Sequence, residues 1–270
     1  MSSQPPSLPL PAGGATPVLS TSNAIEVRDL HKFYGHNEAV AGLSLTVPRG
    51  CFFGFLGPNG AGKTTTIRML MGLVPPTSGS IQILGHRLPQ DSLEIRRHIG
   101  LVPDDTLLFD HLTGAEYLEF VGRIYGLARP LTLSRARELL AIFELDADPQ
   151  KLIAEYSKGM RKRVAMAASL IHGPQLYLMD EPFEGVDAVG ARLMKDILLD
   201  QVRHGATIFL TSHVLDVVER LCDRVAIIHH GRLVMEGSTT DLREGDETLE
   251  DIFVRTVGGR RAVDNLDWLT

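Results

Sequence analysis

The sequence contains little cysteine and no long hydrophobic run. Its 270 residues include two cysteines, Cys51 and Cys222, and both lie in apolar segments. A disulfide framework is therefore excluded, and we expect a reduced chain in the cytoplasm. No apolar run approaches the roughly 20 residues that span a bilayer, and the N-terminal residues lack the pattern of a secretory signal. A role at a membrane would therefore require a partner.

Positive charge is also in deficit. The 27 lysines and arginines are outnumbered by 33 aspartates and glutamates, which gives a formal net charge of −6. This balance weighs against non-specific binding to nucleic acid, and we expect no nucleic-acid partner. The hydrophobic fraction of 44% is ordinary for a globular protein with a sizeable core.

The most informative stretch is rich in glycine and follows the pattern G-x-x-x-x-G-K-[ST], which is typical of phosphate-binding loops. It consists of Gly57, Pro58, Asn59, Gly60, Ala61, Gly62, Lys63, Thr64 and Thr65. Glycines allow successive N–H groups to turn inward and form an anion nest, and the helix that follows points its positive end at the same place. Lys63 can reach the β- and γ-phosphates of a nucleotide, and the Thr64 hydroxyl can ligate Mg²⁺. An apolar strand over residues 51–56 and a helical apolar stripe over 67–74 argue against a chance match.

The chain divides into segments that differ in composition and in the spacing of their apolar residues. Residues 1–22 are rich in Pro, Ser and Gly and are predicted to be disordered, with a Pro-rich docking segment as the alternative. Strand patterns cover 24–30 and 39–47, with 31–35 as a turn, and helical patterns dominate from about 101 to 173. After that, apolar strands and helices alternate up to about residue 257. Residues 258–270 are predicted to be a loose tail.

These segments predict the fold class. Alternating strands and helices indicate an α/β protein with a mainly parallel sheet covered on both faces. We expect a P-loop NTPase core with an N-terminal antiparallel β subdomain and an inserted α-helical subdomain over about 101–173. The folded domain is predicted to span 23–257.

Two carboxylates follow the apolar strand at 176–180. Asp180 ends this strand and Glu181 comes next. Because the carboxyl ends of parallel strands face the ligand crevice, Asp180 suits a Mg²⁺ site and Glu181 suits polarisation of an attacking water. The alternative is an ordinary acidic pair at a strand end.

Several motifs in one order resemble the ATP-binding subunit of an ABC transporter over about residues 24–256. Gly57 to Thr65 matches Walker A, 176–181 matches Walker B, and 156–163 resembles the signature usually written LSGGQ. Residues 184–187 look like the D-loop, and Thr211-Ser212-His213 matches the switch histidine.

The resemblance implies roles for single residues. Lys63, Glu181 and His213 would act in catalysis, and Tyr34 sits where the family places an aromatic that stacks on adenine. The cofactors would be ATP and Mg²⁺, with Thr64 and Asp180 on the metal. The signature helix would be an anion site, with Ser157 as its N-cap.

The resemblance also implies partners. Two ATP-binding subunits, in a homo- or heterodimer, would meet head to tail, so that Ser157 and Gly159 of one subunit face the γ-phosphate on the other, beside Asp187 of the D-loop. A separate transmembrane permease would carry the cargo, and the chain would lie peripherally on the cytoplasmic face of the inner membrane.

Four positions depart from the family pattern. Asp104 stands where most members have a glutamine that touches Mg²⁺. It either senses the metal, directly or through water, or caps the loop without touching a metal. Lys158 replaces the first glycine of the signature, Met160 replaces its glutamine, and Ala188 replaces a common proline. None of these changes affects Lys63, Asp180 or Glu181, so we predict an active ATPase.

The functional prediction is the ATP-hydrolysing motor of a transporter, of the bacterial export type. The alternatives are a soluble ABC-type ATPase and a weakly hydrolysing regulatory module. Apolar residues at 107–109 and Leu112 either dock the permease or belong to the core.

Overall fold

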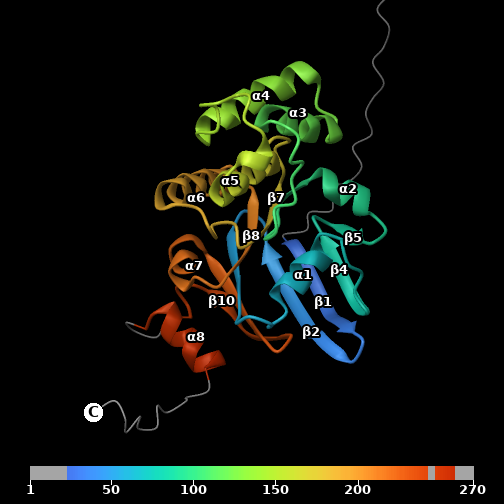
Figure 1. Cartoon of the computed structure of the whole chain (residues 1–270). Helices are drawn as coiled ribbons and strands as arrows, with labels where there is room; N and C mark the ends of the chain where they lie inside the picture. Colours follow the sequence, from blue (N-terminus) through green and yellow to red (C-terminus); the bar gives the residue numbers. More distant parts are fainter. Residues whose placement is uncertain (1–22, 243–246, 259–270) are drawn as a thin grey trace, which may run out of the picture.

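The structure is a computed structural model that describes residues 23–242 and 247–258. Two β-sheets and their helices form the lower half of the molecule in Figure 1, and a helical part lies above them. The tails predicted at 1–22 and 259–270 lie outside the described residues.

The larger sheet has six strands. In spatial order they are β10 (Arg232–Ser238), β9 (Arg224–His229), β3 (Phe52–Leu56), β8 (Thr207–Ser212), β7 (Leu176–Asp180) and β6 (Ile99–Val102). All neighbouring pairs from β9 to β6 are parallel, and only β10 pairs antiparallel. The predicted mainly parallel sheet is confirmed.

Strand β3 shows how both faces of this sheet are covered. Phe52 and Leu56 pack into a core shared with residues from α5, α6 and α7, whereas Phe53 and Phe55 pack into a second core shared with the N-terminal sheet and α1. Because successive side chains of a strand point to opposite faces, a continuous apolar run serves both cores. The strands of the larger sheet therefore lie between two packed cores, one on each face.

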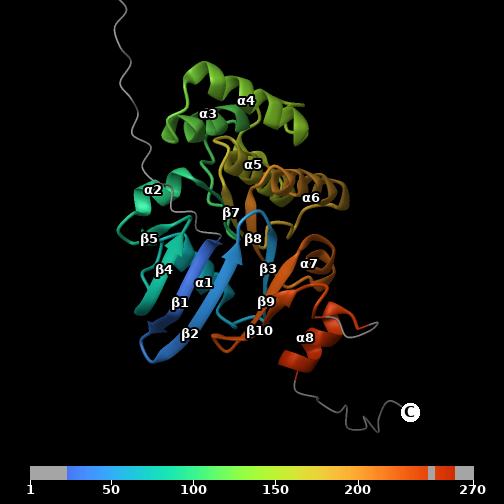
Figure 2. The same ribbon diagram turned by 180° about the vertical axis from the view of Figure 1, so that it is seen from behind.

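The smaller sheet is antiparallel and lies in front in Figure 2. It pairs β2 (Asn37–Pro48), β1 (Asn23–Tyr34), β4 (Ser78–Ile83) and β5 (His86–Leu88) in that order. The turn predicted over 31–35 was wrong in its first four residues, because β1 pairs with β2 as far as Tyr34. The chain reverses at Gly35, whose φ of 59° suits a residue without a Cβ.

The helical part consists of α3 (Gly114–Ile124), α4 (Arg129–Ile142), the short 3₁₀ helix η1 (Ile153–Glu155) and α5 (Lys158–Leu170). Thr113 begins α3 with a capping box, in which its hydroxyl accepts from the N–H of Glu116 and the Glu116 carboxylate accepts from the N–H of Thr113. The boundary expected near residue 101 falls inside β6, and the helices begin at Gly114.

The remaining helices flank the sheets. They are α1 (Lys63–Leu70), α2 (Ser92–Arg97), α6 (Ala188–Arg203), α7 (Leu215–Leu221) and α8 (Leu249–Val257). The helix α2 and the strands β5 and β6 were not predicted. With six residues α2 is shorter than two turns, and β5 and β6 have only three and four residues, fewer than the five of β3 and β7. Within the described residues, no helix has the length and apolar character needed to cross a membrane.

Candidate functional site

The glycine-rich loop joins β3 to α1 and passes very close to its neighbours. A Cβ on Gly57 would lie 2.4 Å from the carbonyl oxygen of Ile228, and one on Gly62 would lie 2.5 Å from the carbonyl oxygen of Ala39. Gly62 also has a φ of 106°. Only glycine fits at these two positions, and the sequence pattern reflects this steric requirement.

The N-terminus of α1 is built to receive an anion. Its N-cap is Gly62, which carries no side chain to occupy the first-turn N–H groups. The Lys63 ammonium lies inside the loop and donates to the carbonyl oxygens of Gly57 at 2.6 Å and Pro58 at 3.3 Å. Burial lowers the pKa of Lys63, and the nearby carboxylates of Glu181 and Asp180 oppose that shift. The loop thus holds a cation beside two acids.

A cavity of about 390 Å³ opens along the loop. The glycine-rich loop contributes Pro58 to Gly60 and Gly62 to Thr65, and the β1–β2 hairpin contributes Tyr34. Tyr34 is 47% exposed and has the Lys32 ammonium 5.1 Å from its ring centroid, and its exposed ring surface can stack on a planar ligand. Gly57 and Ala61 support the loop from within, since the Ala61 carbonyl accepts from the N–H of Gly231 at 2.9 Å.

The sequence analysis missed one wall of this cavity. His230 and Gly231, in the turn between β9 and β10, also line it. They are far from Walker A in the sequence, and the only local signal was a histidine–glycine pair between two strands. The His230 ring lies against that of His229, with centroids 4.0 Å apart and ring planes tilted by 41°.

Asp180 ends β7 in a buried position, with 3% of its surface exposed. The Thr211 hydroxyl, on the neighbouring strand β8, donates to its carboxylate. A buried carboxylate needs such a partner, because burying an unpaired charge is costly. Thr211 entered the sequence analysis only as a neighbour of His213, and its role depends on strand register.

Glu181 follows Asp180 in a left-handed backbone conformation, with a φ of 47°. Its N–H donates to the carbonyl oxygen of Thr211 at 3.2 Å. The carboxylate Oε1 lies 3.0 Å from Nδ1 of His213, which follows β8. Strain of this kind is held by the surrounding structure and is common at active sites. The structure therefore brings together Lys63, Asp180, Glu181 and His213.

The signature turn precedes α5. The Ser157 hydroxyl accepts from the N–H of Met160 at 3.2 Å, which makes Ser157 the N-cap. A Cβ on Gly159 would lie 3.2 Å from the carbonyl oxygen of Gly185, so the turn packs on the D-loop of the same chain. Asp187 caps α6 by accepting from the N–H of Gly190 at 2.8 Å, and this bond lowers the pKa of Asp187.

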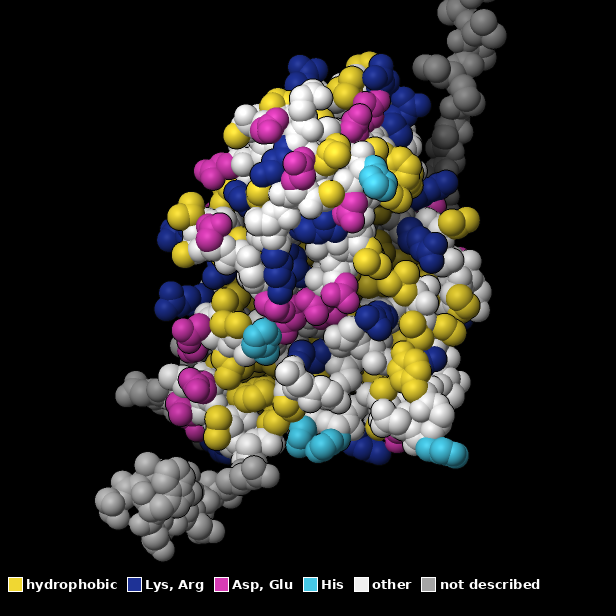
Figure 3. All heavy atoms as spheres, viewed as in Figure 1, with side chains coloured by type: hydrophobic (Ala, Val, Ile, Leu, Met, Phe, Trp, Pro, Cys, Tyr) yellow, Lys and Arg dark blue, Asp and Glu magenta, His cyan; other side chains and the backbone are white. Residues whose placement is uncertain are grey.

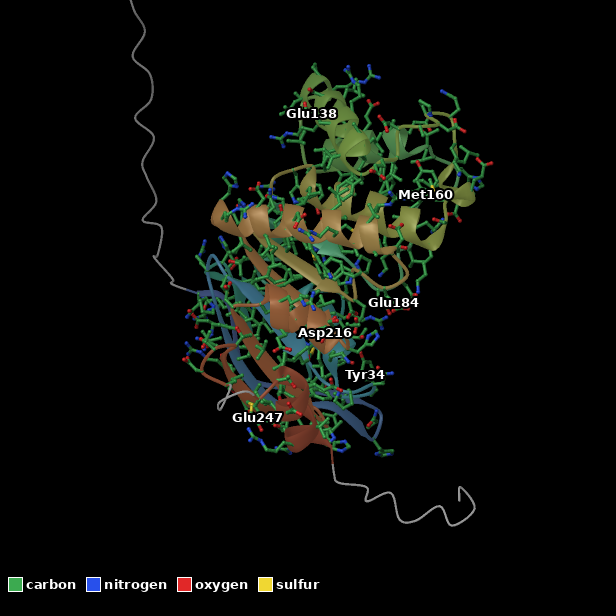
Figure 4. All side chains as sticks on the ribbon, turned by 90° about the vertical axis from the view of Figure 1, so that its left-hand side faces the viewer. Tyr34, Glu138, Met160, Glu184, Asp216 and Glu247 are labelled. Atoms are coloured by element: carbon green, nitrogen blue, oxygen red, sulfur yellow. The ribbon has the colours of Figure 1, made fainter. Side chains whose placement is uncertain are left out.

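Lys158 and Met160, two of the departures from the family pattern, lie at the start of α5. The Lys158 ammonium lies 2.7 Å from the Glu184 carboxylate, and this hydrogen bond raises the pKa of Lys158. Figure 4 shows Met160, Glu184 and Tyr34 along one edge of the molecule, with Glu184 between the other two. Ser157 and Gly159 do not line the cavity that contains Lys63. The signature and the phosphate loop therefore share a face without forming one site.

Asp104 lies in the loop that follows β6. Its carboxylate Oδ1 is 3.6 Å from the ammonium of Lys162, a residue of α5 that the sequence analysis did not single out. Burial lowers the pKa of Lys162, and the Asp104 charge opposes that shift. A lysine four residues after Lys158 gave no sequence signal, because surface helices are rich in lysine.

Acidic side chains gather at the middle of the face shown in Figure 3. Glu184, Asp104 and Asp105 are exposed, and all three raise the pKa of Lys158. Among the described residues, no group of three or more His, Cys, Asp or Glu could hold a metal by itself. Thr64 and Asp180 offer one hydroxyl and one carboxylate, the sparse oxygen donor set with which Mg²⁺ is held beside phosphates.

Comparison with known protein families gives a consistent result. The profile of the ABC transporter family matches residues 40–184. The daunorubicin/doxorubicin resistance ATP-binding protein DrrA of Streptomyces peucetius is 40% identical over 82% of this chain and 67% of its own length. The bacitracin transport ATP-binding protein BcrA of Bacillus licheniformis is 39% identical over 80% of this chain and 70% of its own length.

Solved structures agree with these relatives. An ATP-binding subunit of an ABC transporter superposes with a TM-score of 0.82 and 32% identity, over 86% of this chain and 99% of that chain. A dimeric ATP-binding cassette in a post-hydrolysis state, bound to ADP and Pi, superposes with a TM-score of 0.74 and 25% identity, over 82% of this chain and all of that chain, 100%. The predicted fold class is confirmed.

Proposed function

Because this chain belongs to the ABC transporter family of ATP-binding subunits, we propose that its residues bind and hydrolyse ATP to drive transport through a separate membrane permease. The chain is an ATPase of this family and a transporter motor subunit. The observation that carries the assignment of residues is the arrangement of Glu181, held against His213 and close to the buried Lys63.

ATP fits the cavity beside the glycine-rich loop. The adenine ring stacks on Tyr34, and the phosphates enter the nest formed by Gly57 to Thr65. Lys63 exchanges its bonds to the Gly57 and Pro58 carbonyls for bonds to phosphate oxygens. This exchange replaces neutral acceptors by charged ones, which strengthens the hydrogen bonds.

Mg²⁺ suits the donor set of the site. The Thr64 hydroxyl and the Asp180 carboxylate would hold it, and Thr211 keeps Asp180 oriented. When bound, the ion neutralises charge on the phosphate oxygens. Asp104 is the third residue that we propose as a contact of the ion, through a water molecule. Its carboxylate also lies 3.6 Å from the ammonium of Lys162.

Glu181 and His213 act on the attacking water and the γ-phosphate. Glu181 is 13% exposed at its side chain, lines a pocket together with His213, and is near enough to Lys63 for its charge to raise the pKa of that lysine. It accepts a proton from the water and polarises it for attack. His213, 54% exposed at its side chain, orients Glu181 through Nδ1, and its Nε2 would contact the γ-phosphate.

A second ATP-binding subunit completes the site. Ser157 and Gly159 begin a helix whose N-terminus favours anions, yet they lie outside the cavity of their own chain. In a head-to-tail dimer they face the γ-phosphate bound by the partner, and Asp187 lies at the same junction. ATP then holds the dimer together, and loss of the γ-phosphate releases it.

The permease docks on the helical part of the chain. Leu107 is 92% exposed and Phe109 is 55% exposed, so the patch predicted at 107–109 is largely on the surface. Beside it lies a cavity of about 330 Å³, lined by Leu108, Tyr117 and Val121 among others. An apolar groove next to exposed apolar side chains suits an amphipathic helix of a membrane partner. The chain is therefore peripheral on the cytoplasmic face of the membrane.

The direction of transport is export, as the printed names of several relatives suggest. DrrA acts in drug resistance, and another relative, 39% identical over 88% of this chain, is the Nod factor export ATP-binding protein I of Ralstonia nicotianae. Their cargoes differ, so these names support a direction and leave the cargo open.

The test is ATP hydrolysis by the purified chain with Mg²⁺, measured once with the chain alone and once with the chain added to membranes that contain a candidate permease. We expect hydrolysis that the permease stimulates. Glu181→Gln should abolish turnover while ATP remains bound, and it should trap a dimer on size-exclusion chromatography. Robust hydrolysis that no membrane protein alters would favour the soluble ATPase, and ATP binding without hydrolysis would favour the regulatory module.

A further inference from the structure

Lys162 is a buried lysine near the start of α5, between Arg161 and Arg163. Its side chain is only 1% exposed, although α5 otherwise buries residues such as Val164 and Ala167. Burying an ammonium is costly unless each of its donors finds a partner. The ammonium donates to the carbonyl oxygens of Asp104 at 2.7 Å, Glu181 at 3.2 Å and Pro103 at 3.3 Å.

The three acceptors belong to two segments that are distant in the sequence. Pro103 and Asp104 follow β6, and Glu181 follows β7, the parallel neighbour of β6. A single ammonium on α5 therefore joins the ends of two strands. Three N–H donors meet three backbone carbonyls, so the arrangement uses the full capacity of a lysine.

We propose that Lys162 is a positioning residue for ATP hydrolysis, which fixes the Glu181 peptide and the loop at 103–104 relative to each other. This inference rests on the proposed role of Glu181 in hydrolysis. Lys162 is not among the residues that line the cavity beside the glycine-rich loop, and we assign its effect to its bond with the backbone of Glu181.

The backbone of Glu181 explains why such a link is needed. The residue has a φ of 47°, a conformation that a non-glycine residue keeps only when its surroundings hold it. Thr211 holds the N–H of Glu181, and Lys162 holds its carbonyl oxygen. Together the two bonds orient the side chain toward His213. The N–H of Glu184 also donates to this carbonyl oxygen, at 3.3 Å, so loss of Lys162 leaves the bond within the turn and removes the tie to α5 and the loop at 103–104.

The same link reaches the proposed docking surface. Asp104, whose carbonyl oxygen Lys162 holds, lies three residues before Leu107 in the same loop. A partner that moves this loop would therefore displace the Lys162 ammonium and, through its hydrogen bond, the Glu181 peptide. The expected consequence is that docking alters the catalytic rate more than the affinity for ATP.

The experiment compares Lys162→Met, which removes the donors, with Lys162→Gln, which keeps two of them. For Lys162→Met we expect kcat to fall at least about tenfold while the Kd for ATP changes by less than about threefold, since only positioning for the reaction is lost. Lys162→Gln should be intermediate. The matched control is Arg135→Met, which removes a guanidinium bond of 2.7 Å to the Ile171 carbonyl at the other end of α5. Its kcat should stay within about twofold of wild type.

Hydrogen exchange supplies a readout that does not depend on turnover. In Lys162→Met, peptides covering 103–106 and 181–184 should exchange faster together, whereas peptides covering α1 should not. Unchanged exchange in these two segments, or a kcat within about twofold of wild type, would overturn the proposal. So would a loss of ATP affinity in proportion to the loss of kcat. If the Met variant does not fold, a Gln variant with wild-type kcat and exchange overturns it equally. If the wild-type chain does not hydrolyse ATP, the proposed function fails. Hydrogen exchange at 103–106 and 181–184 then tests by itself whether Lys162 joins the two segments.

Discussion

The hydrogen bond between Thr211 and Asp180 gives the sharpest prediction about stability. Thr211→Val replaces a buried hydroxyl with a methyl group of nearly the same size, so packing stays intact. The Asp180 carboxylate then loses the donor that the Thr211 hydroxyl supplies, in a site where Asp180 is only 3% exposed. Hydrogen bonds to charged groups contribute about 1.5–3 kcal/mol, so the free energy of unfolding should fall by about that amount.

Thr207→Val is the matched control on the same strand. The Thr207 hydroxyl is also buried and accepts from the N–H of Gly50 at 2.9 Å, so this variant removes a bond between neutral groups. We expect a loss of about 0.5–1.5 kcal/mol for the control. Urea unfolding without nucleotide measures both variants, because bound ATP would add stability by mass action. If Thr211→Val lowers the free energy of unfolding no more than Thr207→Val does, the argument that Thr211 donates to a charged group is refuted.

Three further predictions concern the cavity and the helical part. Gly57→Ala should weaken ATP binding at least about tenfold in calorimetry, because its Cβ would lie 2.4 Å from the carbonyl oxygen of Ile228 and push the loop outward; unchanged affinity would contradict the close approach. Tyr34→Trp should keep ATP affinity and Tyr34→Ala should lower it, whereas equal affinities would argue against stacking. Burial lowers the pKa of His172 to about 4, from 6.5 in the unfolded chain. The stability linked to His172 is thus present above pH 6.5 and lost as the pH falls from there toward 4. His172→Phe should accordingly show a smaller drop in Tm between about pH 7.5 and pH 5 than wild type, and parallel drops would refute the linkage.

The parts of the site that the sequence predicted depend on neighbours within a few residues. Ser157 was predicted to cap a helix, and its hydroxyl accepts from the N–H of Met160, three residues on. The glycine-rich loop was recognisable because its spacing follows from the steric needs of one short turn. Alternation of apolar strands with helices likewise predicted the parallel sheet, since it reports burial of each strand on both faces.

The parts that were missed depend on segments that meet only after folding. His230 joins the cavity because the β9–β10 turn is bonded to the loop through Gly231 and Ala61. Thr211 meets Asp180 because β8 and β7 are in register. Lys162 reaches Glu181 because α5 lies over the ends of two strands. No local period or motif carries such information.

Asp104 shows how these two kinds of information combine. The sequence left open whether this residue replaces the usual glutamine at the metal or only shapes its loop. In the structure the loop is held through the carbonyl oxygen of Asp104, to which Lys162 donates at 2.7 Å, and the carboxylate is 47% exposed and 3.6 Å from the same ammonium. The backbone position of the loop therefore depends on Lys162 and little on the side chain at 104. A lysine 58 residues away on α5 thus holds this loop by its main chain, an interaction that is compatible with either aspartate or glutamine at position 104.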